Sequence, residues 1–136
     1  MRKDSAKPTL IVTDNYRLFV ADAYGVAEVH MPALAKSFYL MLLRHLEGVV
    51  FDDSHKARKE LVDSYYDITH SPLDDEQLRQ VVELTEPPMG NIAAMFELIG
   101  QTFIASVGEN RAQPFLVDCS NPYAVRVALP SENVMW

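Results

Sequence analysis

Apolar and polar residues follow a short-strand pattern over the first third of the chain. Thr9–Thr13, Tyr16–Ala21 and Val26–Met31 are rich in β-forming residues, and the last segment alternates two sets of side chains, as a strand with one buried face does. Asp14–Asn15 and Asp22–Gly25 lie between these segments and are typical of turns. The pattern predicts a short N-terminal antiparallel β-meander.

Beyond Pro32 the apolar residues change to a helical spacing. Leu34, Phe38 and Leu42 recur at intervals that place them on one face of a helix. Pro32 suits the first position of a helix, and Gly48 is a good stop. Further apolar residues widen the stripe, so we expect this helix to be central to the fold.

Two more helices are predicted before Pro87–Pro88. Asp52, Asp53 or Ser54 would cap the first, and the acidic residues after Ser71–Pro72 would begin the second. Apolar residues at helical spacing form their inner sides, namely Ala57, Leu61, Tyr65 and Ile68 in one helix and Leu78, Val81 and Val82 in the other.

The segment Met89–Ser106 is predicted as a helix, capped by Asn91, with one apolar and one nearly uncharged side. Its core face would carry Ile92, Met95, Phe96, Ile99 and Phe103. Its outer face would carry Ala93, Ala94, Glu97, Gly100, Gln101 and Ile104. After a break at Gly108–Asn110, the strands Pro114–Asp118 and Tyr123–Leu129 predict a hairpin with its turn at Cys119–Pro122.

Together these elements predict one α+β domain over residues 1–136, with residues 1–7 as a loose terminus. The order resembles the winged-helix effector domain of OmpR/PhoB-type bacterial response regulators. The resemblance rests on MPALAKSFYLMLLRHLEGVVF at Met31–Phe51 and NPYAVRVAL at Asn121–Leu129. LLRHLEG at Leu42–Gly48 and ALPSENVMW at Ala128–Trp136 are also similar to a pattern in a group of uncharacterised single-domain bacterial proteins. The resemblance implies a winged-helix-like fold with a C-terminal β-hairpin wing, in which Met89–Ser106 is the helix that would enter the DNA major groove.

The charge of that helix differs from the family pattern. No lysine or arginine occurs between Arg79 and Arg111, and the chain has a formal net charge of −7. Neutralising phosphates supplies much of the affinity of a DNA-binding helix. Asn91 and Gln101 could read base edges, but without phosphate contacts such reading would be weak. DNA is therefore a disfavoured partner.

A DNA-binding transcriptional regulator remains the alternative, and it would use cations outside that helix. The candidate phosphate contacts are Lys56, Arg58, Lys59, Arg111 and Arg126. The first three form the densest basic group, which Glu60 and Asp63 balance in the manner of a solvated helix face.

The small and nearly uncharged outer face of Met89–Ser106 favours contact with protein instead. Small residues allow close approach of another helix, and few charges lower the cost of burial. We expect this face to be covered by a second copy or by another part of the chain. A helix fully internal to a monomer is an almost equal alternative.

The chemistry-bearing residues predict no catalytic, metal or cofactor site. The four histidines include no pair four residues apart, the spacing of a helical metal site. Asp52, Asp53 and His55 could hold a divalent ion, but a capped helix start explains them better, and the same holds for Asp74–Glu76. The chain has no phosphate loop, dinucleotide fingerprint or nucleophile elbow. An enzyme with a site built from distant residues ranks third, and a polar pocket at His45 or His70 would favour it.

Two further features concern the cell compartment and the C-terminus. Cys119 is the single cysteine and fits a reducing cytosol. No segment approaches the roughly 20 apolar residues of a membrane span, so we expect a cytoplasmic protein with no membrane partner. The apolar end Val134–Trp136 is expected to dock on the body of the protein.

Overall fold

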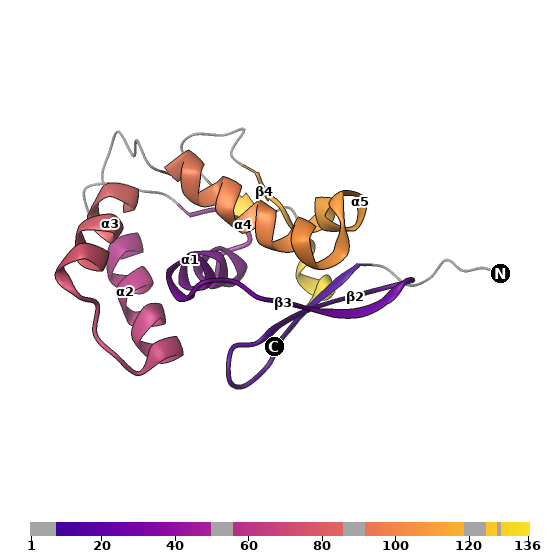
Figure 1. Ribbon diagram of the computed structural model, residues 1–136, viewed down its shortest axis with the longest axis horizontal. Helices are drawn as coiled ribbons and strands as arrows, with labels where there is room; N and C mark the ends of the chain where they lie inside the picture. The colour runs from indigo at the N-terminus through magenta and orange to yellow at the C-terminus, as the bar shows by residue number, and fades with distance from the viewer. Residues whose placement is uncertain (1–7, 50–55, 86–91, 119–124, 128) are drawn as a thin grey trace.

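An N-terminal antiparallel sheet opens the chain, as expected (Figure 1). In the computed structural model, β1 (Thr9–Val12) pairs with β2 (Leu18–Asp22), which pairs with β3 (Gly25–Val29). Gly25 has a φ of 127°, which glycine tolerates in the turn before β3. The structure describes residues 8–49, 56–85, 92–118, 125–127 and 129–136.

The chain end supplies a fourth strand that the sequence pattern did not predict. β6 (Val134–Met135) pairs in parallel with β1 and gives the sheet order β3-β2-β1-β6. The buried Asn133, at the end of η2 (Ser131–Asn133), donates from Nδ2 to the carbonyl oxygen of Pro8 at 2.8 Å. The expected docking of the C-terminal segment is therefore confirmed, and it takes the form of strand addition.

The predicted helices are also present, but Leu78, which was expected on the inner side of its helix, is 45% exposed. The helices are α1 (Ala33–Arg44), α2 (Lys56–Thr69), α3 (Asp75–Thr85) and α4 (Ile92–Val107). Asp74 and Gln77 cap α3 reciprocally, because each side chain accepts a hydrogen bond from the backbone amide of the other. The caps expected at Asp52–Ser54 and Asn91, the stop at Pro87–Pro88 and the turn at Cys119–Pro122 lie outside the described residues.

Helix α1 lies at the centre of the core. Its residues from Ser37 to Leu43 are all buried, and α2 and α4 pack against it. The Tyr39 ring lies 5.1 Å from the Phe103 ring of α4, and Phe103 stacks on Phe115 at 5.5 Å. The Tyr39 hydroxyl donates to the carbonyl oxygen of Phe115 at 2.6 Å, so this buried polar group is satisfied.

The segment after α4 corrects the expectation of a strand beginning at Pro114. Gly108, with a φ of 86°, ends α4 as expected, but a short helix α5 (Glu109–Ala112) and a 3-10 turn η1 (Gln113–Phe115) follow. The turn accommodates Pro114 and brings Phe115 into the aromatic cluster. Tertiary packing of one phenylalanine therefore overrides the local β preference.

The C-terminal pair of strands is shorter than predicted but present. β4 (Val117–Asp118) pairs antiparallel with β5 (Arg126–Val127). Val49, in the link after α1, forms an antiparallel bridge with Val125, with N–O distances of 2.8 and 3.1 Å. The molecule is thus a mixed α+β protein with N-terminal antiparallel strands, five helices and a C-terminal strand pair among its described residues.

Candidate functional site

Helix α4 presents an exposed side that carries little charge. Ala93, Ala94, Glu97 and Gln101 are exposed, as expected from the helical wheel. Leu98 joins them, with 42% of its surface exposed. Leu98 belonged to neither predicted face, and it gives the exposed side an apolar centre.

Two residues expected on that outer side lie elsewhere. Gly100 and Ile104 are partly buried. A Cβ at Gly100 would lie 3.4 Å from Cδ2 of Leu116, so the segment after η1 passes close to the helix backbone. Ile104 packs against the core. The helical wheel was wrong for these two positions because a later segment of the chain covers part of the predicted outer face.

A groove of about 330 Å³ runs between α3 and α4, beside Leu98. Its apolar floor is formed by side chains from both helices, and charged or polar residues of α3 form one rim. The lining residues are Glu76, Arg79, Gln80, Glu83, Leu84, Ala94, Met95 and Leu98. An apolar groove with a polar rim on a helix pair is typical of a protein contact surface.

The cations proposed as phosphate contacts differ in their surroundings, and Arg111 is the most firmly held. Its Nε and one terminal nitrogen donate to the two carboxylate oxygens of Asp22 at 2.8 and 2.9 Å. Its guanidinium also lies over the Tyr24 ring, 5.4 Å from the centroid. The guanidinium hydrogen bond is the main reason why the pKa of Asp22 lies below its ordinary value. Arg111 therefore clamps α5 to the β2–β3 turn.

The basic group on α2 is engaged within the protein only in part. Arg58 donates from Nε to the hydroxyl of Thr85 on α3 at 3.1 Å. Lys59 pairs with Asp63 one turn along at 3.1 Å. Lys56 and Arg126 are exposed, at the start of α2 and on β5 respectively. The structure therefore provides fewer cations for a phosphate backbone than the sequence indicated.

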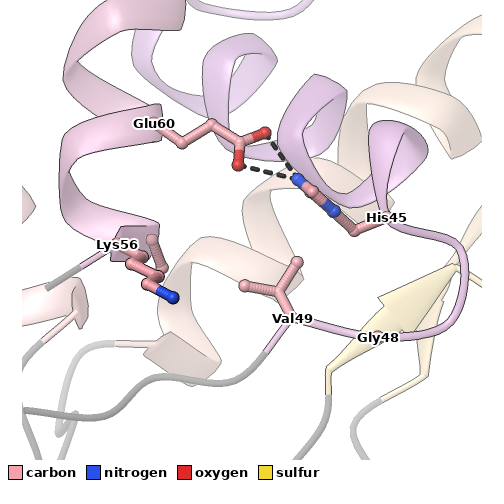
Figure 2. Close-up of a pocket in the computed structure, with 6 residues that line it drawn as sticks. His45, Gly48, Val49, Lys56 and Glu60 are labelled. Atoms are coloured by element: carbon pink, nitrogen blue, oxygen red, sulfur yellow. Dashed lines mark hydrogen bonds and ion pairs between the residues drawn. The ribbon is translucent and has the colours of Figure 1, made fainter. Parts of the chain in front are cut away.

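A small pocket lies where α1 ends against α2 (Figure 2). His45, Gly48 and Val49 come from the end of α1 and its link, and Lys56, Ala57 and Glu60 come from α2. Figure 2 shows the imidazole of His45 directed at Glu60, with Nε2 at 2.7 and 2.9 Å from the two carboxylate oxygens. Sequence reasoning missed this pair, because fifteen residues separate its members.

The geometry of this pocket fits a structural link better than a catalytic pair. The Nδ1 atom of His45 faces Glu47 at 3.3 Å, so both ring nitrogens already face carboxylates. A general base needs one nitrogen directed at the substrate. The pocket holds about 140 Å³. Most small-molecule sites measure roughly 300–1,000 Å³. His45 therefore joins the end of α1 to α2.

A larger hollow of about 440 Å³ lies between the β1–β2 turn and the end of α2. Tyr16 and His70, on its two sides, both have left-handed backbones, with φ of 62° and 56°. It is lined by Asp14, Asn15, Tyr16, Tyr66, Asp67, Ile68 and His70. Among the described residues, no hydrogen bond or ion pair joins the ring of His70 to Asp14 or Asp67.

The remaining candidate ligands do not converge. Asp52, Asp53 and His55 lie outside the described residues. Asp74 to Glu76 begin α3, as the capped-helix interpretation expected. Within the part of the chain that the structure describes, no group of three or more histidine, cysteine or acidic side chains is placed to hold a metal ion.

The fold and these surfaces define the class of molecule as a mixed α+β protein. Comparisons with protein families, curated proteins and solved structures find no match. Across the described residues, each helix is too short or too polar to cross a bilayer.

Proposed function

We propose that this protein is a non-catalytic, winged-helix-like cytoplasmic protein that acts through protein–protein contact, and that its partner is a second copy of itself. The contact surface is the exposed side of α4 together with the α3–α4 groove. The observation that carries this proposal is the exposed Leu98 beside an apolar groove, on a helix without a single lysine or arginine.

A second copy suits this surface because an exposed leucine and an apolar groove lie side by side on it. Arg79 on the α3 rim already pairs with Glu76, so the apolar contact carries the fit. A two-fold contact would place Leu98 of each copy in the groove of the other. The small Ala94 side chain leaves room for that leucine. Such a contact is self-complementary, as the interface of a symmetric dimer must be.

The test measures the mass of the full chain in solution with and without Leu98→Glu. We expect the wild type to self-associate through this surface. Replacing a buried leucine contact with a charge should weaken this contact by about a hundredfold or more and lower the mass of the assembly, since such a side chain contributes roughly 1.5–3 kcal/mol before the cost of burying the charge. Analytical ultracentrifugation over a range of concentrations gives both values.

The matched control is Leu78→Glu. Leu78 lies on α3, is 45% exposed and does not line the groove. This variant should keep the mass of the wild-type assembly. A wild type that stays monomeric at high concentration, or an equal loss of association in both variants, would refute the proposed surface.

DNA binding is the second candidate function, and the exposure of Lys56 and Arg126 is the observation in its favour. The bridge from Val49 to Val125, beside the β4–β5 pair, also agrees with the expected wing. Fluorescence anisotropy with duplex DNA at physiological salt separates the two functions. Tight binding that is weakened by Lys56→Ala and by Arg126→Ala would support a DNA-binding regulator. An affinity for DNA weaker than that of ordinary nonspecific binding would reject it.

A further inference from the structure

The four-stranded sheet has a second face that points away from the helices. Strand pairing places Ile11 beside Phe19 and Met135 in one row across β2, β1 and β6. The alternate residues of the same strands, such as Leu10 and Val20, are fully buried in the core. Because successive side chains of a strand point to opposite faces, the row from Phe19 to Met135 lies on the outer face.

This outer face is apolar where an exposed sheet face is usually polar. A neighbouring row pairs Ala21 with Val26, whose surface is 68% exposed, and Met135 is 55% exposed. Antiparallel sheets with one wet face normally carry polar residues there. In Figure 1, α1, α4 and α5 all lie on the other side of the strands. The helices therefore leave this apolar face uncovered.

The charges on this face are of both signs, and Lys36 lies near enough to interact with both members of the central pair. Arg17 forms a bidentate pair with Glu28. Its Nε and one terminal nitrogen donate to the two carboxylate oxygens at 2.9 and 2.7 Å. The guanidinium of Arg17 lies over the Phe19 ring, 5.2 Å from the centroid. The hydrogen bond from Arg17 is the main reason why the pKa of Glu28 lies below its ordinary value. A face that carries both signs of charge suits association of two copies of a chain whose net charge is −7 better than an acidic face does.

We propose that this sheet face binds the same face of a second copy of the chain. A two-fold axis running diagonally across the face, close to Ile11 and Phe19, places Arg17 of one copy beside Glu28 of the other. The two charge pairs then form a cluster of alternating signs at the rim of a buried apolar centre. The strands of the two sheets cross at a steep angle, which is one of the two common ways in which sheets pack.

This surface is separate from the α3–α4 groove and goes beyond the function proposed above. Each surface forms a closed two-fold contact. With both contacts present, the wild type assembles beyond a dimer. Loss of either contact alone leaves a dimer held by the other.

The first test places a charge at either edge of the face. Val26→Lys and Met135→Lys alter exposed side chains, so both variants should fold, which circular dichroism verifies. In the Leu98→Glu background, each should weaken the remaining dimer by about tenfold or more. Leu78→Lys in the same background is the control and should leave the dimer intact. Equal masses for all three variants would overturn the proposal.

The second test uses charge reversal to separate contacts between copies from the pair within one copy. Both variants are made in the Leu98→Glu background. Arg17→Glu brings acids of the two copies together at the rim, and Glu28→Arg brings arginines together there. The repulsion between like charges should make each variant monomeric. An equimolar mixture of these two variants restores opposite charges only across the interface, so we expect a dimer of one copy of each. A mixture that stays monomeric would overturn the proposal, because the pair within each copy is broken in both variants.

Discussion

The inner and outer sides of α4 belong to the same helix but have different surroundings. On the inner side, Phe103 is fully buried between Tyr39 and Phe115, and Phe96 meets Phe38 edge to face at 5.7 Å. On the outer side, Leu98 is 42% exposed. The inner side therefore contributes to folding of the single chain, and the outer side retains apolar surface that the single chain does not bury.

The arginines show the same contrast. Arg111 makes two hydrogen bonds to Asp22, whose side chain is only 8% exposed, whereas Arg126 is exposed on β5. Both were candidate phosphate contacts on the basis of sequence. Their surroundings indicate that Arg111 holds the fold together, so a search for surface function should concentrate on the side chains that the fold does not use.

The largest expected effect comes from truncating the inner side of α4. Phe103→Ala removes a fully buried ring and should lower the free energy of unfolding by about 3–5 kcal/mol. The outer substitution Gln101→Ala should change it by less than about 0.5 kcal/mol. Urea unfolding followed by circular dichroism measures both. A loss of stability in Gln101→Ala like that of Phe103→Ala would show that the two sides do not differ as described.

Most of the elements could be predicted from sequence because their signals are local. Helical spacing marks α1, although the helix ends at Arg44, before the expected stop at Gly48. The reciprocal Asp74–Gln77 cap marks the start of α3. The outer side of α4 was predicted in part, since a helical wheel correctly placed Ala94 outside. It could not show that Leu116 would approach Gly100, because the path of a later segment depends on tertiary packing.

Contacts between distant residues were the part that sequence did not reveal. Asp22 and Arg111 are 89 residues apart, and the two-residue strand β6 is too short to show an alternating pattern. Pro114 and Phe115 were predicted to begin a strand, but they lie in a 3-10 turn, and Phe115 packs in the aromatic cluster. Nor did sequence predict the His45–Glu60 pair, for which neither residue carries a spacing signal.

The second prediction tests whether Arg111 is structural. Asp22→Ala leaves the partly buried guanidinium without its acceptor and should cost about 1.5–3 kcal/mol of stability. Arg111→Ala should lower the melting temperature in the same direction, and Arg126→Ala should leave it nearly unchanged. Thermal unfolding of the three variants and the wild type makes the comparison. Equal melting temperatures for Arg111→Ala and Arg126→Ala would remove the contrast between the two arginines.

The smallest effect is a pH dependence that reports on the same ion pair. Arg111 lowers the pKa of Asp22, so the folded state binds a proton at this carboxyl less readily than the unfolded chain does. The resulting stabilisation is complete above the unfolded value of about 3.9 and is lost as the pH falls through the lower folded pKa. Asp22→Asn cannot ionise, so its free energy of unfolding should decline less steeply than that of the wild type below about pH 4. If Asp22→Asn and the wild type lost stability in parallel over this range, the Asp22 carboxylate would not be held by Arg111 in solution.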